Sequence, residues 1–185
     1  ESVRVWPIAI QDGTFDDWAF VRPEFRDTIG DPAQRNHPGF DSAVTLVNTS
    51  GRNDLVAAKV SADATNVYFH IRTAAPLTPP STNWMLLFID ADTNAQTGWL
   101  GYDLVVNRTG VSGSQTTVER NLGGAYAWGS PVTVPLRFAG NQLELSIPRS
   151  VLGAATFDFK WADNILQTGD SSDFTLNGDA APNDR

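Results

Sequence analysis

Residues 55–72 read LVAAKVSADATNVYFHIR, and this stretch decides the fold class. Apolar and polar side chains alternate along residues 67–72, as they do in a strand with one buried face. The residues between the two apolar halves, Asp63-Ala64-Thr65-Asn66, favour a tight turn. The stretch therefore predicts an antiparallel hairpin that sends Val67, Phe69 and Ile71 toward the core and Tyr68, His70 and Arg72 away from it.

Short apolar segments separated by turn residues recur on both sides of this hairpin. Residues 84–90 are almost continuously apolar, which is typical of a strand buried on both faces. Further strands are predicted at residues 4–10, 44–48, 102–107, 116–120, 132–138, 143–147, 157–161 and 174–176. Residues 148–153 are expected to form one helical turn, and residues 22–43 a long surface loop. About ten strands with little helix predict an all-β fold, a two-sheet antiparallel β-sandwich of jelly-roll type.

Length, cysteine content and charge limit the number of domains and the kinds of partner that the protein can have. The chain has 185 residues, which suits a single domain over residues 1–185, and it has no cysteine, so no disulfide holds it together. Its net charge of −8 argues against nucleic acid as a partner, because phosphates require a basic surface. No apolar run is long enough to span a bilayer, so we expect no membrane partner, and we expect a monomer.

The start of the chain, Glu1-Ser2-Val3-Arg4, lacks the apolar segment of a signal peptide. Two interpretations follow: a cytoplasmic protein, or an exported one whose leader has been removed. We expect the second, which places the protein in a secreted, extracellular or periplasmic location.

Aspartate dominates the acidic residues, with 17 of the 21, and its short side chain is an oxygen ligand for hard cations. The densest group lies in residues 90–98, where oxygen-bearing side chains alternate. We predict a structural calcium ion held by Asp90, Asp92, Asn94, Gln96 through its carbonyl, and Asp103. The alternative is that Asp90 and Asp92 only cap a turn by accepting backbone N–H groups.

Two further acidic groups have weaker signals. Asp12, Asp16 and Asp17 are expected to have turn and cap roles around Trp18. The spacing of a third group leaves room for a second ion; its members are Asp163, Asn164, Asp170, Asp173 and Asp179.

Six tryptophans suggest sugar binding, because flat aromatic faces stack on pyranose rings. Trp84, Trp99 and Trp128 lie at strand ends or in loops beside small polar residues, and they are the candidates for exposed stacking faces. Tyr126 and Arg72 are the further sugar-contact candidates. Core packing is the alternative for each ring. The outward-facing residues Tyr68, His70 and Arg72, with Lys59 beside them, form a second candidate ligand face. The favoured alternative is that this face of the sheet is simply exposed to solvent.

An ordered set of motifs resembles the family-9 carbohydrate-binding modules and their DOMON-like relatives. The motifs are Asp12-Gly13-x-x-Asp16-Asp17-Trp18, Val67-Tyr68-Phe69, Phe88-Ile89-Asp90 and Leu143-Glu144-Leu145-x-Ile147-Pro148-x-x-x-Leu152-Gly153. The resemblance covers most of the chain. It implies a β-sandwich with structural calcium, and such modules are usually fused to glycan-degrading enzymes. It also implies that Trp84 of the sandwich stacks on the sugar. The family has a second stacking aromatic residue near its C-terminus, and no Trp follows Trp161 in this sequence.

These features favour a non-catalytic carbohydrate-binding accessory module that binds a polysaccharide or oligosaccharide. We expect no enzyme, because Glu144 and the other three glutamates offer no evident carboxylate pair for glycoside cleavage. A haem-binding DOMON domain would need axial ligands such as Met85 and His70, which the alternation does not bring together. The main alternative is a structural docking domain, which predicts an exposed apolar patch at Trp99, Trp128 or residues 22–43.

Overall fold

The computed structural model describes residues 8–32, 35–39 and 43–182, and this part of the chain is almost entirely β. The strands are β1 (Glu24–Arg26), β2 (Asn36–Pro38), β3 (Thr45–Val47), β4 (Leu55–Ala62), β5 (Asn66–Thr73), β6 (Leu86–Asp90), β7 (Leu104–Val106), β8 (Gln115–Asn121), β9 (Trp128–Ala139), β10 (Gln142–Pro148), β11 (Asp158–Asp163) and β12 (Asp179–Ala181). The helical segments are α1 (Arg149–Leu152) and two 3-10 turns, η1 (Asp16–Phe20) and η2 (Ser171–Phe174). In the described ranges no helix is long and apolar enough to cross a membrane. The all-β prediction is confirmed.

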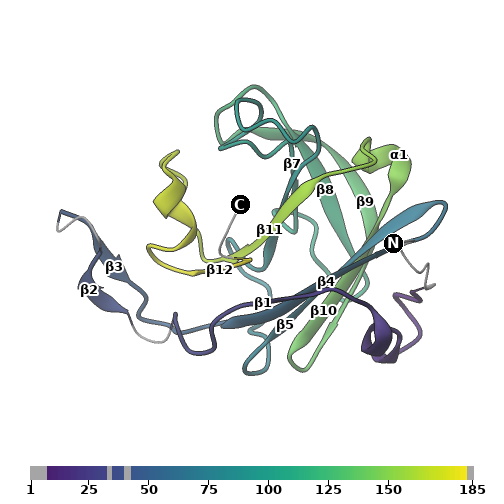
Figure 1. Ribbon diagram of the computed structural model, residues 1–185, viewed down its shortest axis with the longest axis horizontal. Coiled ribbons are helices and arrows are strands. Elements are labelled where there is room, and N and C mark those ends of the chain that lie inside the picture. The colour runs from purple at the N-terminus through teal and green to yellow at the C-terminus, as the bar shows by residue number, and fades with distance from the viewer. Residues whose placement is uncertain (1–7, 33–34, 40–42, 183–185) are drawn as a thin grey trace.

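Ten strands form one antiparallel sheet in the order β1-β4-β5-β10-β9-β8-β7-β6-β11-β12, while β2 and β3 pair with each other. The sheet curls until it nearly forms a barrel, and the β2–β3 hairpin lies apart from it (Figure 1). The long strand β9 joins the two halves, because its end pairs with β10 and its beginning with β8. Ser130, at φ 52°, and a register shift between Val118 and Arg120 mark an irregularity in the β8–β9 pairing. The sequence predicts two separate sheets, whereas the structure has these ten strands in one hydrogen-bonded, nearly barrel-shaped sheet.

The hairpin predicted from residues 55–72 is confirmed as β4 and β5, with Val60 opposite Phe69. Its turn is closed by Asp63, whose Oδ1 accepts the backbone N–H groups of Thr65 and Asn66, each at 2.7 Å. The Tyr68 hydroxyl donates to the other carboxylate oxygen at 2.7 Å. These bonds hold the pKa of Asp63 well below its usual range, so the turn keeps its charge and its geometry.

The core fills the inside of the curled sheet, and Val67, Phe69 and Ile71 point into it as predicted. The opposite face of β5 is also covered: Tyr68 and His70 are buried, although the sequence favours a solvated face there. This face is buried because of tertiary packing: Trp18 of η1 and Ile8 and Ile10 of the preceding segment pack against it. The sequence pattern of one strand does not reveal that a distant segment covers it.

Three boundaries differ from the predictions. The predicted surface loop at 22–43 contains β1, which pairs with β4, and β2. The last strand lies at Asp179–Ala181 rather than at 174–176, where η2 ends. Most of the strand predicted at residues 4–10 lies outside the described residues, and residues 8–10 are not in a strand. The helical turn before Gly153 is confirmed as α1, with Gly153 at φ 75°.

Candidate functional site

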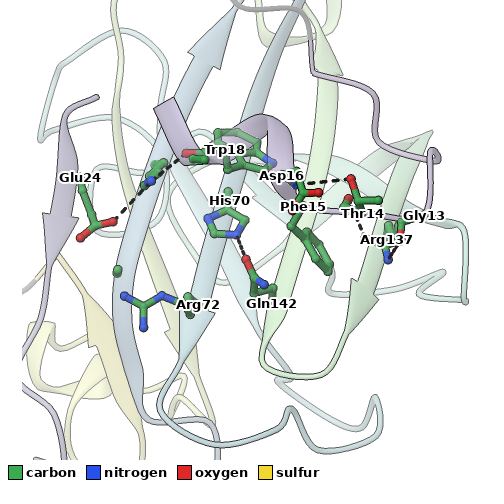
Figure 2. Close-up of a pocket in the computed structure, with 13 residues that line it drawn as sticks. Gly13, Thr14, Phe15, Asp16, Trp18, Glu24, His70, Arg72, Arg137 and Gln142 are labelled. Atoms are coloured by element: carbon green, nitrogen blue, oxygen red, sulfur yellow. Dashed lines mark hydrogen bonds and ion pairs between the residues drawn. The ribbon is translucent and has the colours of Figure 1, made fainter. Parts of the chain in front are cut away.

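A polar pocket lies where η1 crosses the outer face of β4, β5, β10 and β9 (Figure 2). Its volume is about 460 Å³. Its charged and amide side chains are Asp16, Glu24, Lys59, Arg72, Arg137 and Gln142. Alternation on neighbouring strands explains this set, because residues on the outer face of the sheet cannot enter its apolar core. The outer face of the sheet therefore forms one side of the pocket, and residues 13–19, which cover part of that face, form the other.

Trp18 anchors η1 on the sheet. Its ring stacks on His70 with a centroid distance of 4.9 Å and an interplanar angle of 23°. Its indole Nε1–H donates to Glu144 Oε2 at 2.7 Å, and Lys59 Nζ donates to the Trp18 carbonyl at 2.8 Å. Ring stacking and charge-assisted hydrogen bonds from three strands, β4, β5 and β10, thus hold Trp18 and fix one wall of the pocket.

Two buried titratable groups lie under this wall. Burial raises the pKa of Glu144 to about 7, against the opposing effects of the Trp18 hydrogen bond and of Arg137, whose Nη1 is 3.7 Å from Glu144 Oε1. Burial lowers the pKa of His70 to about 4, so this imidazole is neutral near pH 7. The second oxygen of Glu144 and Nδ1 of His70 have no hydrogen-bond partner among the described residues. Of these two groups, Glu144 is the one that changes charge near neutral pH.

The positively charged side chains of the pocket differ in how many hydrogen bonds and ion pairs they make within the protein. Arg137 donates to the carbonyls of Thr14 and Gly13 and lies 4.1 Å from the centre of the Phe15 ring. Lys59 bonds the Trp18 carbonyl and lies 3.5 Å from Glu24 Oε2. The guanidinium of Arg72 has no hydrogen bond or ion pair within the described chain.

Figure 2 shows Arg72 extending away from His70 and Gln142, whose side chains are joined by a 3.0 Å hydrogen bond. The pocket can therefore offer the Arg72 donors to a ligand, with Glu24 and Asp16 as acceptors and Phe15 as an apolar surface. Such an arrangement can bind a small molecule that carries several hydroxyl groups or a carboxylate.

The other predicted sugar contacts lie elsewhere. Trp84, Trp99 and Trp128 are 0%, 2% and 8% exposed, so none presents a ring face to solvent, and the prediction that they are exposed stacking faces is wrong. Trp84 packs against Phe138 in the inner core and donates to the Thr78 carbonyl at 2.8 Å. Large rings at strand ends are the largest apolar surfaces available there, and burying them is the favoured outcome.

A second aromatic cluster accounts for the remaining two tryptophans and for Tyr126. Trp99 contacts Tyr126 edge to face at 4.8 Å, and Tyr126 contacts Trp128 at 5.7 Å. Phe88 and Phe174 complete the cluster on the outer face of β6, where the segment containing η2 covers the sheet. Tyr126 is half-buried, and of the five predicted sugar contacts only Arg72 lines the polar pocket.

The predicted calcium loop brings three of its five residues together. Carboxylate oxygens of Asp90, Asp92 and Asp103 lie within 4.8 Å of one another, and Asp90 is 1% exposed. The other two predicted ligands differ: the amide oxygen of Asn94 accepts the backbone N–H of Gln96 at 3.1 Å, and Gln96 is exposed.

Turn hydrogen bonds also occupy these carboxylates. Asp90 and Asp92 each accept the Asn94 N–H, at 3.2 and 3.0 Å, and Asp103 accepts the Ala91 N–H at 2.9 Å. Gly98 closes the loop at φ 64°, where a Cβ would collide with the Tyr102 carbonyl. The cap role and a cation-binding role therefore involve the same three carboxylates.

A second acidic cluster escaped the sequence reasoning. Asp27, Asp31 and Asp179 have carboxylate oxygens within 4.8 Å of one another, although Asp179 lies in β12 and the other two in the segment after β1. Burial, followed by the charges of Asp31, Asp27 and Asp54, raises the pKa of Asp179 to about 8. Arg35 Nη2 lies 3.7 Å from Asp179 Oδ1. Residues so far apart in the chain give no spacing signal, so only the fold could reveal this cluster.

The third predicted acidic group does not gather around one point, although Asp163 and Asp179 lie opposite each other in the β11–β12 pairing. Asp163 pairs with Arg52 at 2.7 Å and accepts the Met85 N–H at 2.9 Å, which is a structural role. Asp173 accepts the Thr168 hydroxyl and the Gly169 N–H, and Asp170 caps η2 by accepting the Ser172 N–H. The interpretation of these residues with Asp179 as one ion site is wrong.

Two of the three aspartates predicted to stabilise turns around Trp18, Asp12 and Asp17, have that role, whereas η1 has no side-chain hydrogen bond at its N-cap. Asp12 accepts the Thr14 N–H at 2.9 Å, and Asp17 accepts the Ala9 N–H at 2.9 Å, so both stabilise turns around Trp18. Such turns occur in many folds, so these hydrogen bonds do not assign the chain to a family. Searches with models of known protein families, with curated proteins and with solved structures each gave no match to this chain.

Proposed function

We propose that this protein is a non-catalytic carbohydrate-binding module that holds part of an oligosaccharide or polysaccharide in the polar pocket. The observation that carries the proposal is the guanidinium of Arg72, which faces the pocket without a hydrogen bond or ion pair to the described residues. Arginine has five N–H donors in a fixed plane, and these match vicinal hydroxyls or a sugar carboxylate. A pocket of about 460 Å³ suits one or two sugar units rather than an extended chain.

The neighbouring side chains support this assignment. Gln142 and Lys59 add donors beside Arg72, and Glu24 and Asp16 add acceptors for sugar hydroxyls. Phe15 is half-buried and supplies an apolar surface for a C–H face of the ring. This set replaces the buried tryptophans as the basis for sugar binding.

We also propose a structural calcium ion at Asp90, Asp92 and Asp103. Two backbone N–H groups and the Thr97 hydroxyl, which bonds Asp92 at 3.0 Å, donate to these carboxylates, and these three donors are neutral. Three carboxylates this close repel one another, so a divalent cation would stabilise the loop by balancing their charge. The ion would fix the β6–β7 connection and would take no part in sugar contacts.

The family resemblance supplies the rest of the proposal. The two halves of the curled sheet, joined at β9, would correspond to the two layers of the sandwich that the resemblance implies. The module would be exported and would bring a fused glycan-active domain to its substrate. The alternative is a docking domain without its own ligand, for which Ile29, 73% exposed in the segment after β1, is the first contact to examine.

A glycan array followed by titration calorimetry tests the sugar proposal. We expect the protein to retain at least one class of glycan, and Arg72→Gln to weaken that binding about tenfold or more, because a charged donor is lost. Arg120→Gln is the matched control, since Arg120 bonds the Val151 carbonyl away from this pocket. No glycan bound by the wild-type protein, or equal binding by Arg72→Gln, would overturn the proposal and favour the docking domain.

A further inference from the structure

An apolar pocket of about 410 Å³ opens where the two ends of the curled sheet meet. β1 forms one end of the hydrogen-bonded sheet, and β11 with β12 forms the other. Phe25 of β1 and Phe159 of β11 meet across this seam with a ring distance of 5.3 Å. The seam between these strands is thus packed by side chains rather than by the strand pairing that joins the other neighbours.

The lining of this pocket is unlike that of the polar pocket. Phe25, Phe157 and Phe159 are half-buried around it, and Val60 and Ala62 of β4 form its floor. On β4 the alternate residues, such as Lys59, face the polar pocket, so the two pockets lie on opposite faces of the same strands. Three partly exposed aromatic rings in a concave site offer apolar area that a ligand could remove from water.

Two arginines stand beside these rings. Arg22 donates through Nη1 to the carbonyls of Ala19 and Val21, at 3.1 and 2.8 Å. Arg149 donates through Nε to the Asp63 carbonyl at 2.8 Å. Within the described ranges neither guanidinium makes an ion pair with a carboxylate, in a chain whose net charge is −8.

The acid in the lining, Asp63, does not neutralise these arginines. Its carboxylate oxygens accept the Tyr68 hydroxyl and the N–H groups of its own turn. The remaining N–H groups of both arginines are therefore available to an external anion.

We propose that this pocket binds an amphiphilic carboxylate, with its apolar body among the phenylalanines and its carboxylate at Arg22 and Arg149. Both halves of such a ligand find a complementary group: the body replaces water at the rings, and the anion pairs with arginines that lack a carboxylate partner. An uncharged molecule of the same shape would gain only the first contribution. The site is separate from the proposed sugar pocket, and its occupation does not depend on sugar binding.

Calorimetric titration with decanoate, kept below the concentration at which it forms micelles, tests the proposal. We expect saturable binding at one site, with decan-1-ol binding about tenfold more weakly, since the alcohol lacks the charge-assisted hydrogen bonds. The double variant Arg22→Gln/Arg149→Gln should reduce decanoate binding to the level of the alcohol. Arg120→Gln should bind decanoate as the wild type does, because its guanidinium lies elsewhere.

A steric variant tests the location. Ala155 is exposed and lines the pocket, so Ala155→Trp should fill the entrance and abolish binding of both probes while the melting temperature stays near that of the wild type. Ala125→Trp, at an exposed turn position, is the matched control. The proposal is overturned if wild-type protein shows no saturable decanoate binding, if Ala155→Trp binds decanoate normally, or if decanoate and decan-1-ol bind equally well.

Discussion

The environment of Asp179 strongly disfavours its charged form. Burial, then the charges of Asp31, Asp27 and Asp54, raises its pKa to about 8, and burial also raises the pKa of Asp31. We therefore expect Asp31→Asn to stabilise the calcium-free protein by about 1 kcal/mol at pH 9, where Asp179 is ionised, because the substitution removes a like charge beside it. Urea unfolding in the presence of EDTA measures this change.

The exposed Asp158 provides the control for this substitution. Asp158→Asn should leave the free energy of unfolding within about 0.5 kcal/mol of the wild type. A loss of stability in Asp31→Asn under the same conditions would show that Asp31 is stabilising through Arg35, and that the repulsion in this cluster is the smaller effect.

Glu144 gives the protein a pH dependence near neutrality. Its pKa is about 7 in the folded state and 4.5 in an unperturbed chain, so the folded state binds the proton more tightly. The stability this provides is present below about pH 4.5 and is lost as the pH rises to about 7. Asp179 acts in the same direction, whereas His70, with a lowered pKa of about 4, makes acidification below about pH 6.5 destabilising.

Glu144→Gln isolates the contribution of this residue. We expect the difference in unfolding free energy between pH 5 and pH 8 to shift by on the order of 1–2 kcal/mol relative to the wild type, in favour of the variant at pH 8. Urea unfolding at the two pH values measures it, since Asp179 and His70 contribute equally to both proteins. An identical pH dependence of the two proteins would mean that Glu144 titrates normally in the folded state.

Among the segments, η1 makes the largest difference to the polar pocket. It is too short to be stable alone, so its position depends on the contacts of Trp18. Trp18→Phe would keep an aromatic ring on His70 but remove the N–H that bonds the buried Glu144. We expect a loss of about 1–3 kcal/mol in the free energy of unfolding, measured with urea, and faster chymotryptic cleavage after the exposed Phe20, the last residue of η1. A variant with wild-type stability and cleavage would show that the indole hydrogen bond is dispensable.

The same segments show what the sequence could and could not predict. β4 and β5 were predictable because period-two alternation and the Asp63 turn are local signals. β1 was missed because three residues inside a polar stretch carry no periodicity, and its strand geometry comes from pairing with β4. The sequence named Arg72 and three aspartates of the predicted calcium loop, but it misplaced the tryptophans, since their burial depends on which distant segments cover each face of the sheet.

At the scale of the whole molecule, the effect of calcium on thermal unfolding shows which of the two acidic clusters binds the ion. A ligand that binds only the folded state raises its stability, by about 2.7 kcal/mol at a hundred times the dissociation constant. We expect thermal unfolding to occur at a lower temperature in EDTA than in excess calcium. Asp103→Asn should remove this difference, because it takes a carboxylate from the loop that holds Asp90 and Asp92. Its own unfolding in EDTA should stay close to that of the wild type, since asparagine can still accept the Ala91 N–H.

Asp31→Asn reports on the other cluster under the same conditions. If the ion is bound at the β6–β7 loop, this variant keeps the full calcium response and gains stability in EDTA, because its substitution relieves only the repulsion around Asp179. If the response instead disappears in Asp31→Asn and persists in Asp103→Asn, the ion is bound between the segment after β1 and β12, where it would hold the two ends of the curled sheet together. A wild-type protein that unfolds at the same temperature with EDTA and with calcium would leave the loop as a turn capped by its own aspartates.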